Sequence, residues 1–101
     1  MAMLEIPLSS DAPHFSQEHQ IFGHIYTLEF EWIEREQYWT LHLYGEDETP
    51  IALGLRVNTD WPIFCDQNLG LSFLLTPKNP NAKLDLKTLY GDFMLVAYEI
   101  V

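Results

Sequence analysis

The stretch from Tyr26 to Tyr44 alternates large apolar and polar side chains in two arms, which are joined by a short charged turn. Alternation with a period of two is typical of β-strands that bury one face. A slip of one residue in the pairing would turn Trp39 and the leucines of the second arm toward water, so the pattern itself defines the register. The sequence therefore predicts a β-hairpin in which the chain reverses at Arg35 and Glu36.

One face of this hairpin is apolar, and we expect its six large side chains to form the structural core of the protein. Apolar cross-strand pairs stabilise a sheet by roughly 0.2–1 kcal/mol each beyond simple burial. No residue in the turn, 34–37, favours a positive φ, so we expect a four-residue loop on a type I turn and not a two-residue I′ or II′ turn. The expected apolar pairs are Trp32 with Trp39, Phe30 with Leu41 and Leu28 with Leu43, and the expected polar pairs are Glu31 with Thr40 and Glu29 with His42.

The N-terminal segment Met3–Leu8 places apolar side chains at Leu4, Ile6 and Leu8, and it also contains Pro7. Proline has no amide N–H to donate, so it is not expected in a central strand. We therefore expect either an edge strand or an arm that reaches across a partner.

Further short strands, with turn residues between them, are expected along the rest of the chain. Residues 14–23 alternate weakly and should pair with the central hairpin through a turn near Phe22 and Gly23. Residues 51–58 should form the third strand of a meander, in which Gly54 allows a bulge or a close backbone approach. After this strand we expect an irregular crossing over 63–70, a strand buried on both faces over 71–76 and a long surface loop over 77–87. A closing strand with two apolar faces is expected over 93–101. No amphipathic helix is expected.

This arrangement predicts an all-β fold, either a small antiparallel β-sandwich or a partly open β-barrel, with an N-terminal extended arm. A length of 101 residues is consistent with a single domain over residues 1–101. A free sheet edge, the arm and the two-faced last strand indicate assembly with copies or partners.

The chain carries 15 acidic and 5 basic side chains, a net charge of −10. Such a charge opposes approach to a phosphate backbone or an anionic membrane, so neither nucleic acid nor membrane is expected as a partner. Acidic residues concentrate in the central hairpin and the turn after it, whereas Lys78, Lys83 and Lys87 come late. A solvated strand face explains this pattern better than a head-to-tail contact between an acidic and a basic patch.

The single cysteine, Cys65, excludes an intrachain disulfide. The N-terminus has neither the basic region nor the apolar core of a signal peptide, and no apolar run approaches the roughly 18 residues of a membrane-spanning helix. We therefore expect a chain that is made, and first works, in the cytoplasm.

No residue pattern predicts a catalytic group, a cofactor or a metal ion. His14, His19 and His24 recur every five residues, a spacing that puts successive histidines on opposite faces of a strand and leaves no zinc set. Cys65 has no nucleophile signature around it, and neither a phosphate-binding loop nor a dinucleotide fingerprint is present. Catalysis is therefore the weakest of the functional hypotheses.

Trp61 and Pro62 follow the third strand of the meander, in a turn. A tryptophan in a turn is either a core plug or an interface anchor. The sequence leaves both interpretations open.

A series of motifs runs along nearly the whole chain. In order, these are the Ile-Pro-Leu arm within Leu4–Leu8, the W-x-x-R-x-x-x-W spacing of Trp32, Arg35 and Trp39, the L-x-L of Leu41 and Leu43, the acidic turn before Pro50 and Ile51, the Gly54 strand, Trp61 with Pro62, and Leu89 with Tyr90. Together they resemble the small β-rich baseplate plug family of contractile-tailed bacteriophages with simplified baseplates. These motifs are structural residues, and no catalytic signature is among them.

The resemblance implies a virion structural protein of the tail baseplate, assembled in the host bacterial cytoplasm and present in several copies. It implies contacts with tube, hub or sheath-initiating proteins, with no enzymatic activity. The candidate partner contacts are then Leu4, Ile6 and Leu8 of the arm, together with Trp61 and Pro62.

The chain departs from the family pattern after Cys65. Relatives tend to be rich in proline and glycine there, whereas this chain has Asp66–Gly70. The contacts of the crossing over 63–70 therefore do not follow from the resemblance. The alternative function is a small β-barrel module that binds a small ligand or a host protein, an alternative favoured by 14 aromatic residues in so short a chain.

Overall fold

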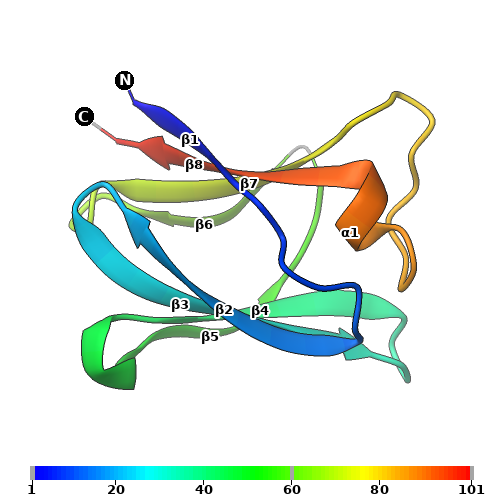
Figure 1. Ribbon diagram of the computed structural model, residues 1–101, viewed down its shortest axis with the longest axis horizontal. Helices are drawn as coiled ribbons and strands as arrows, with labels where there is room; N and C mark the ends of the chain where they lie inside the picture. The colour runs from blue at the N-terminus through cyan, green and yellow to red at the C-terminus, as the bar shows by residue number, and fades with distance from the viewer. Residues whose placement is uncertain (1, 60, 101) are drawn as a thin grey trace.

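The computed structural model describes residues 2–59 and 61–100, in which eight strands form two four-stranded antiparallel sheets (Figure 1). We call the sheet with the order β1-β8-β7-β6 the arm sheet, and the sheet with the order β2-β3-β4-β5 the hairpin sheet. Within the described residues the two sheets stack without closing into a barrel, which confirms the predicted all-β sandwich. The strands are β1 (Met3–Ile6), β2 (His14–Ile21), β3 (His24–Ile33), β4 (Tyr38–Tyr44), β5 (Pro50–Arg56), β6 (Pro62–Asp66), β7 (Leu71–Pro77) and β8 (Phe93–Glu99).

The central hairpin, β3 and β4, pairs in the predicted register, and all five expected cross-strand pairs occur. The chain reverses over four residues, 34–37, and the N–H of Glu36 donates a hydrogen bond of 3.2 Å to the carbonyl oxygen of Ile33. The loop length is as predicted. Gln37 nevertheless has a φ of +59°, which the sequence did not indicate because glutamine rarely adopts the left-handed region.

The strands on either side of the hairpin complete a four-stranded meander. β2 pairs with β3 through the predicted turn at Phe22 and Gly23, whose φ angles of +50° and +87° suit a two-residue hairpin turn. β5 pairs with β4, and two register shifts interrupt this pairing. Gly54 has a φ of +70°, in agreement with the bulge expected there.

The prediction of irregular structure over 63–70 is wrong for its first half. Residues Pro62–Asp66 form β6, which pairs with β7. A register shift between Pro62 and Phe64 interrupts the period of two, and this bulge is why the strand was not visible in the sequence. The second half is a turn, in which the Oδ1 atom of Asp66 accepts hydrogen bonds from the N–H groups of Asn68 and Leu69.

The sequence predicted that the N-terminal segment forms either an edge strand or an arm that reaches across a partner. In the structure it forms an edge strand. β1 pairs with β8, and the N–H of Glu99 donates to the carbonyl oxygen of Ala2 at 2.9 Å. β7 is largely buried, and β8 carries buried residues on both of its faces, as predicted. β8 ends at Glu99. Two residues with predictions lie outside the described residues. They are Val101, which was expected in the last strand, and Asp60, which was expected in the turn after β5.

The core lies between the two sheets. Five of the six hairpin residues expected in the core are buried, whereas Trp32 is only partly buried and packs against the others. The rings of Trp32 and Trp39 meet edge to face, with their centroids 5.7 Å apart. The Nε1–H of Trp39 donates a 3.0 Å hydrogen bond to the carbonyl oxygen of Asp85, so it links the core to the long loop after β7.

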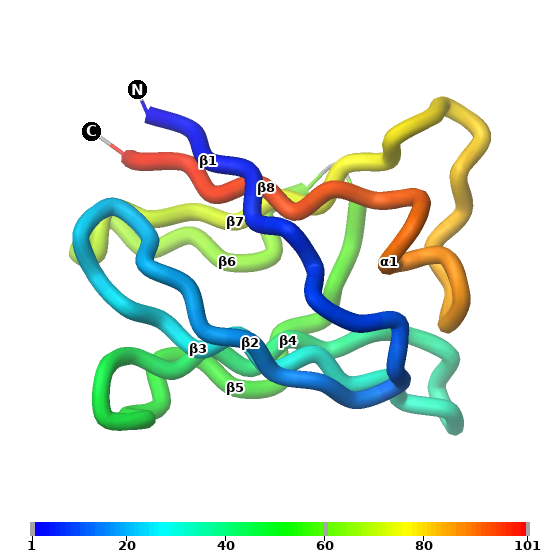
Figure 2. The backbone as a smooth tube through the Cα atoms, viewed as in Figure 1, coloured from blue at the N-terminus to red at the C-terminus, as the bar shows by residue number. Residues whose placement is uncertain are grey.

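This loop covers the core at one end of the sandwich, where it leads into the one-turn helix α1 (Leu89–Asp92) that the sequence did not predict (Figure 2). Ala82, Leu84 and Leu86 of the loop are partly buried against the core. We call this the α1 end. The opposite end, the η1 end, is formed by the turn after β2, the turn after β6 and the 3-10 helix η1 (Glu46–Glu48).

Candidate functional site

The apolar side chains of the N-terminal strand divide between the surface and the core. Leu4 is 38% exposed, whereas Ile6 is 1% exposed and belongs to the core. Leu8, after the end of β1, is partly buried against the core. Of the three candidate contacts in this segment, Leu4 is thus the one with an exposed side chain, whereas Ile6 and Leu8 hold the segment against the sandwich.

Trp61 is 72% exposed, so it is not the core plug that was one of its two interpretations. The residues around it are well anchored, because Val57 before it and Ile63 after it are both buried. Pro62 starts β6, which has no neighbouring strand on its outer side in the described part of the chain. Trp61 is therefore a large aromatic side chain presented beside a free sheet edge, on the opposite edge of the arm sheet from β1.

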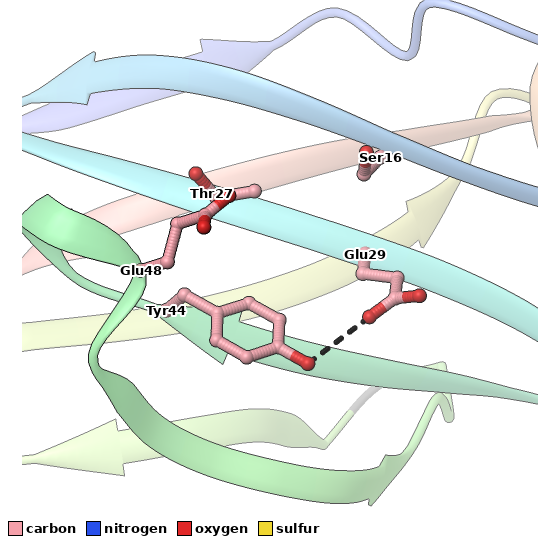
Figure 3. A pocket seen from close by; sticks show the side chains of 5 residues that line it. All are labelled: Ser16, Thr27, Glu29, Tyr44 and Glu48. Carbon is pink, nitrogen blue, oxygen red and sulfur yellow. Dashed lines mark hydrogen bonds between the residues drawn. The ribbon is translucent and has the colours of Figure 1, made fainter.

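The outer face of the hairpin sheet carries a polar depression of about 370 Å³ (Figure 3). Its lining comes from three strands and from η1. The hydroxyl of Tyr44 donates a 3.1 Å hydrogen bond to the Oε1 atom of Glu29. The lining residues are Ser16, Thr27, Glu29, Tyr44 and Glu48.

Glu29, in this depression, also forms a hydrogen bond with a histidine. Its Oε2 atom forms a hydrogen bond with the Nε2 atom of His14, which lies on the neighbouring strand β2. This bond lowers the pKa of Glu29 from the usual value of 4.5, the Tyr44 hydroxyl adds to the effect, and partial burial opposes it. Burial and the hydrogen bond to Glu29 in turn raise the pKa of Tyr44 above 10.0.

His42 is the cross-strand partner of Glu29, as predicted, but its side chain contacts another carboxylate. The Nδ1 atom of His42 accepts a 2.9 Å hydrogen bond from the N–H of Gly54 in β5. The proton of the neutral ring is therefore on Nε2, which lies 3.5 Å from the Oε1 atom of Glu31. The bulge at Gly54 supplies this N–H group, so β5 orients the imidazole together with Glu31 of β3.

The histidines and the cysteine lie on different sheets. Cys65 is exposed on β6 of the arm sheet, opposite Ser72. The histidines are all on strands of the hairpin sheet. Over residues 2–59 and 61–100, no group of three or more histidine, cysteine, aspartate or glutamate residues is placed to hold a metal ion.

No helix in those same ranges is long and apolar enough to cross a membrane.

Leu53, Ile25 and Leu69 are exposed apolar side chains that the sequence did not single out. Leu53 is 57% exposed and lies beside a register shift in β5, although alternation places it with the partly buried Ile51 and Leu55. Ile25 at the start of β3 and Leu69 in the turn before β7 are 40% and 42% exposed. Both lie at the η1 end, and their proximity depends on how the two sheets stack.

The surface of the molecule thus carries exposed apolar side chains and a polar, acidic face. Both are features of a protein that binds other proteins. Residues 3–99 match the family described as cyanophage baseplate Pam3 plug gp18. The chain belongs to this family. No curated protein matches it.

Membership in this baseplate plug family assigns the chain a structural role in a phage baseplate and a location in the virion tail baseplate. It also implies association with other baseplate proteins. The resemblance inferred from the tryptophan spacing and the other motifs is therefore confirmed.

Proposed function

We propose that this chain is a non-enzymatic component of a contractile-tail baseplate that contacts tube, hub or sheath-initiating proteins in several copies per virion. It is assembled into the tail in the cytoplasm of the host bacterium. The observation that carries the proposal is the family match over residues 3–99, which covers both sheets.

Two elements are proposed as contacts with these neighbours, and both are supported by exposure. Trp61 and Pro62 present an aromatic anchor at one edge of the arm sheet, and tryptophan is enriched among residues that dominate binding energy. Leu4 lies at the other edge, on β1. Ile6 and Leu8 support this second contact by holding β1 against the core.

The net charge of −10 suits a neighbour of the tail conduit, because negative walls do not retain passing DNA. The same charge repels a phosphate backbone, so we do not propose nucleic acid as a partner. This argument supports the proposed location and is independent of the two contact elements.

Mass spectrometry of purified virions tests the proposal. We expect peptides of this chain in tail preparations, and particles lacking the gene product should be deficient in baseplate assembly. Absence of the chain from intact particles would refute the proposed function. A defined catalytic turnover that is lost on Cys65→Ala would refute its non-enzymatic part.

The alternative, a module that binds a small ligand, has weaker support. The sheets of the described chain do not close into a barrel, and the depression in Figure 3 is lined by polar side chains, whereas small-molecule sites are mostly apolar. A saturable small-molecule complex of a monodisperse monomer would favour this alternative over the baseplate role.

A further inference from the structure

The η1 end of the sandwich is hollowed, both over η1 and between η1 and the turn before β7. Two adjoining hollows, of about 540 and 530 Å³, share Ile25, Gly45 and Glu46 in their lining. One extends over the acidic helix η1, and the other extends to Leu69 in the turn before β7. We call the two together the η1 groove.

The floor of the η1 groove is apolar and accessible. Ile25 and Leu69 come from different sheets, are 40% and 42% exposed, and line the same hollow, together with Ile51. Apolar side chains that face one concave surface gain free energy when another chain covers them, in proportion to the area removed from water.

The hollow over η1 is acidic, because Glu18, Glu46, Asp47 and Glu48 line it, and Glu46 also lines the hollow that contains Leu69. We call these four residues the rim of the η1 groove. Neither hollow has a lysine or arginine in its lining. The side chains of these four residues make no hydrogen bond or ion pair within the described part of the chain. Their negative charge is therefore not neutralised internally.

The charge distribution decides which kind of chain fits. The turn at 34–37 and the loop after β7, which carry Arg35 and the three lysines, lie at the α1 end (Figure 1). Arg56 stacks on Tyr38, at the start of β4, and so belongs to that end as well. These segments also carry acidic residues, and each copy has a net charge of −10, so a second copy of this chain is a poor occupant.

We propose that the η1 groove binds a segment of a neighbouring baseplate protein that carries lysine or arginine among apolar residues. The alkyl part of such a side chain lies on Ile25 and Leu69, and its charged end reaches the carboxylates of the rim. This inference rests on the proposed baseplate role, and it identifies a contact separate from the edges at Leu4 and Trp61.

Photo-crosslinking in assembled particles tests the proposal. A phage lacking the gene is complemented with full-length chains that carry benzoylphenylalanine in place of Leu69, in the groove, or in place of Leu53, which is exposed on β5 outside it. After illumination of purified virions, we expect position 69 to crosslink to a lysine- or arginine-containing peptide of another virion protein, at several times the yield of position 53. Crosslinks from position 69 to another copy of this chain alone, or none beyond the yield at position 53, would overturn the inference while leaving the proposed function intact.

Charge-matched variants make the test specific for the rim. Glu46→Gln with Asp47→Asn removes two carboxylates from the groove, and Asp11→Asn with Glu36→Gln removes two elsewhere, so both raise the net charge by two. We expect the groove pair to lower the crosslink yield at position 69 about threefold to tenfold, and the control pair less than about twofold. Equal effects would show that only net charge matters, which would contradict a specific groove. If the chain is absent from particles altogether, the proposed function fails, and this inference fails with it.

Discussion

Trp39 stabilises the protein through its buried ring and through the hydrogen bond from its Nε1–H to Asp85. Trp39→Ala should lower the free energy of unfolding by about 3–5 kcal/mol, because it leaves a cavity and a carbonyl oxygen without its donor. Urea unfolding followed by circular dichroism measures this change. The matched control is Trp61→Ala, which removes the same side chain from an exposed site and should cost less than about 0.5 kcal/mol. Similar losses in the two variants would contradict the assignment of the core.

The lowered pKa of Glu29 makes stability depend on pH. The folded-state pKa lies below the usual 4.5, so the stabilisation from Glu29 is present above about pH 4.5 and is lost as the pH falls through the lowered pKa. Melting temperatures of the natural chain and of Glu29→Gln should therefore differ near neutral pH and converge in acid. Glu36→Gln, in the exposed turn of the central hairpin, is the control for the loss of one negative charge, and it should change the melting temperature little near neutral pH. A constant difference between the natural chain and Glu29→Gln at all pH values would refute this role of Glu29.

Among the elements, the turn between β2 and β3 depends on the backbone freedom of Gly23. A Cβ atom at Gly23 meets no atom within 4 Å, so the φ of +87° alone makes alanine unfavourable there. Gly23→Ala should lower the free energy of unfolding by roughly 1–2 kcal/mol. Gly91→Ala, in α1, also meets no atom within 4 Å and lacks a positive φ, so it should be neutral or stabilising by up to about 1 kcal/mol. Chemical denaturation of both variants separates backbone strain from crowding, and an equal effect at the two sites would argue against strain.

The elements also show how far the sequence could predict the structure. The register of β3 and β4 was predictable because the apolar period is unbroken and a slip would expose several large side chains. β6 was missed because a bulge breaks its period, and α1 was missed because four residues with a central glycine give no helical period.

Side-chain contacts between strands were less predictable from the sequence than the positions of the strands themselves. The hydrogen bond of His14 with Glu29 depends on the pairing of β2, whose weak alternation left its side-chain partners undefined. The exposure of Trp61 and the joint lining of the η1 groove by Ile25 and Leu69 depend on the stacking of the sheets. No local pattern in the sequence indicates this stacking. The family was predictable because the motifs that carry the resemblance run along nearly the whole chain, as does the family match over residues 3–99.

For the whole molecule, the proposed contacts should affect assembly and not folding. Trp61→Ser should leave the unfolding midpoint nearly unchanged, because the side chain is 72% exposed. It should nevertheless weaken incorporation into particles, since loss of an aromatic anchor typically costs about 2 kcal/mol of binding, or roughly thirtyfold in affinity. Leu4→Ser should act in the same direction to a smaller extent.

Quantitative mass spectrometry of particles from a complemented deletion strain measures this incorporation. Leu53→Ser is the control, because it removes an exposed apolar side chain that is outside the proposed contacts. Normal incorporation of the Trp61 and Leu4 variants would exclude both edges of the arm sheet as contacts.

The pairing of β1 with β8 also determines when each sheet can form. The hairpin sheet is built from consecutive strands between residues 14 and 56, so its pairings close short loops and can form while the chain is still being synthesised. The arm sheet joins the first strand of the chain to the last, and this pairing must wait until β8 has been made. We therefore expect the hairpin sheet to fold early and the arm sheet late, so that β1 remains unpaired until β8 has left the ribosome.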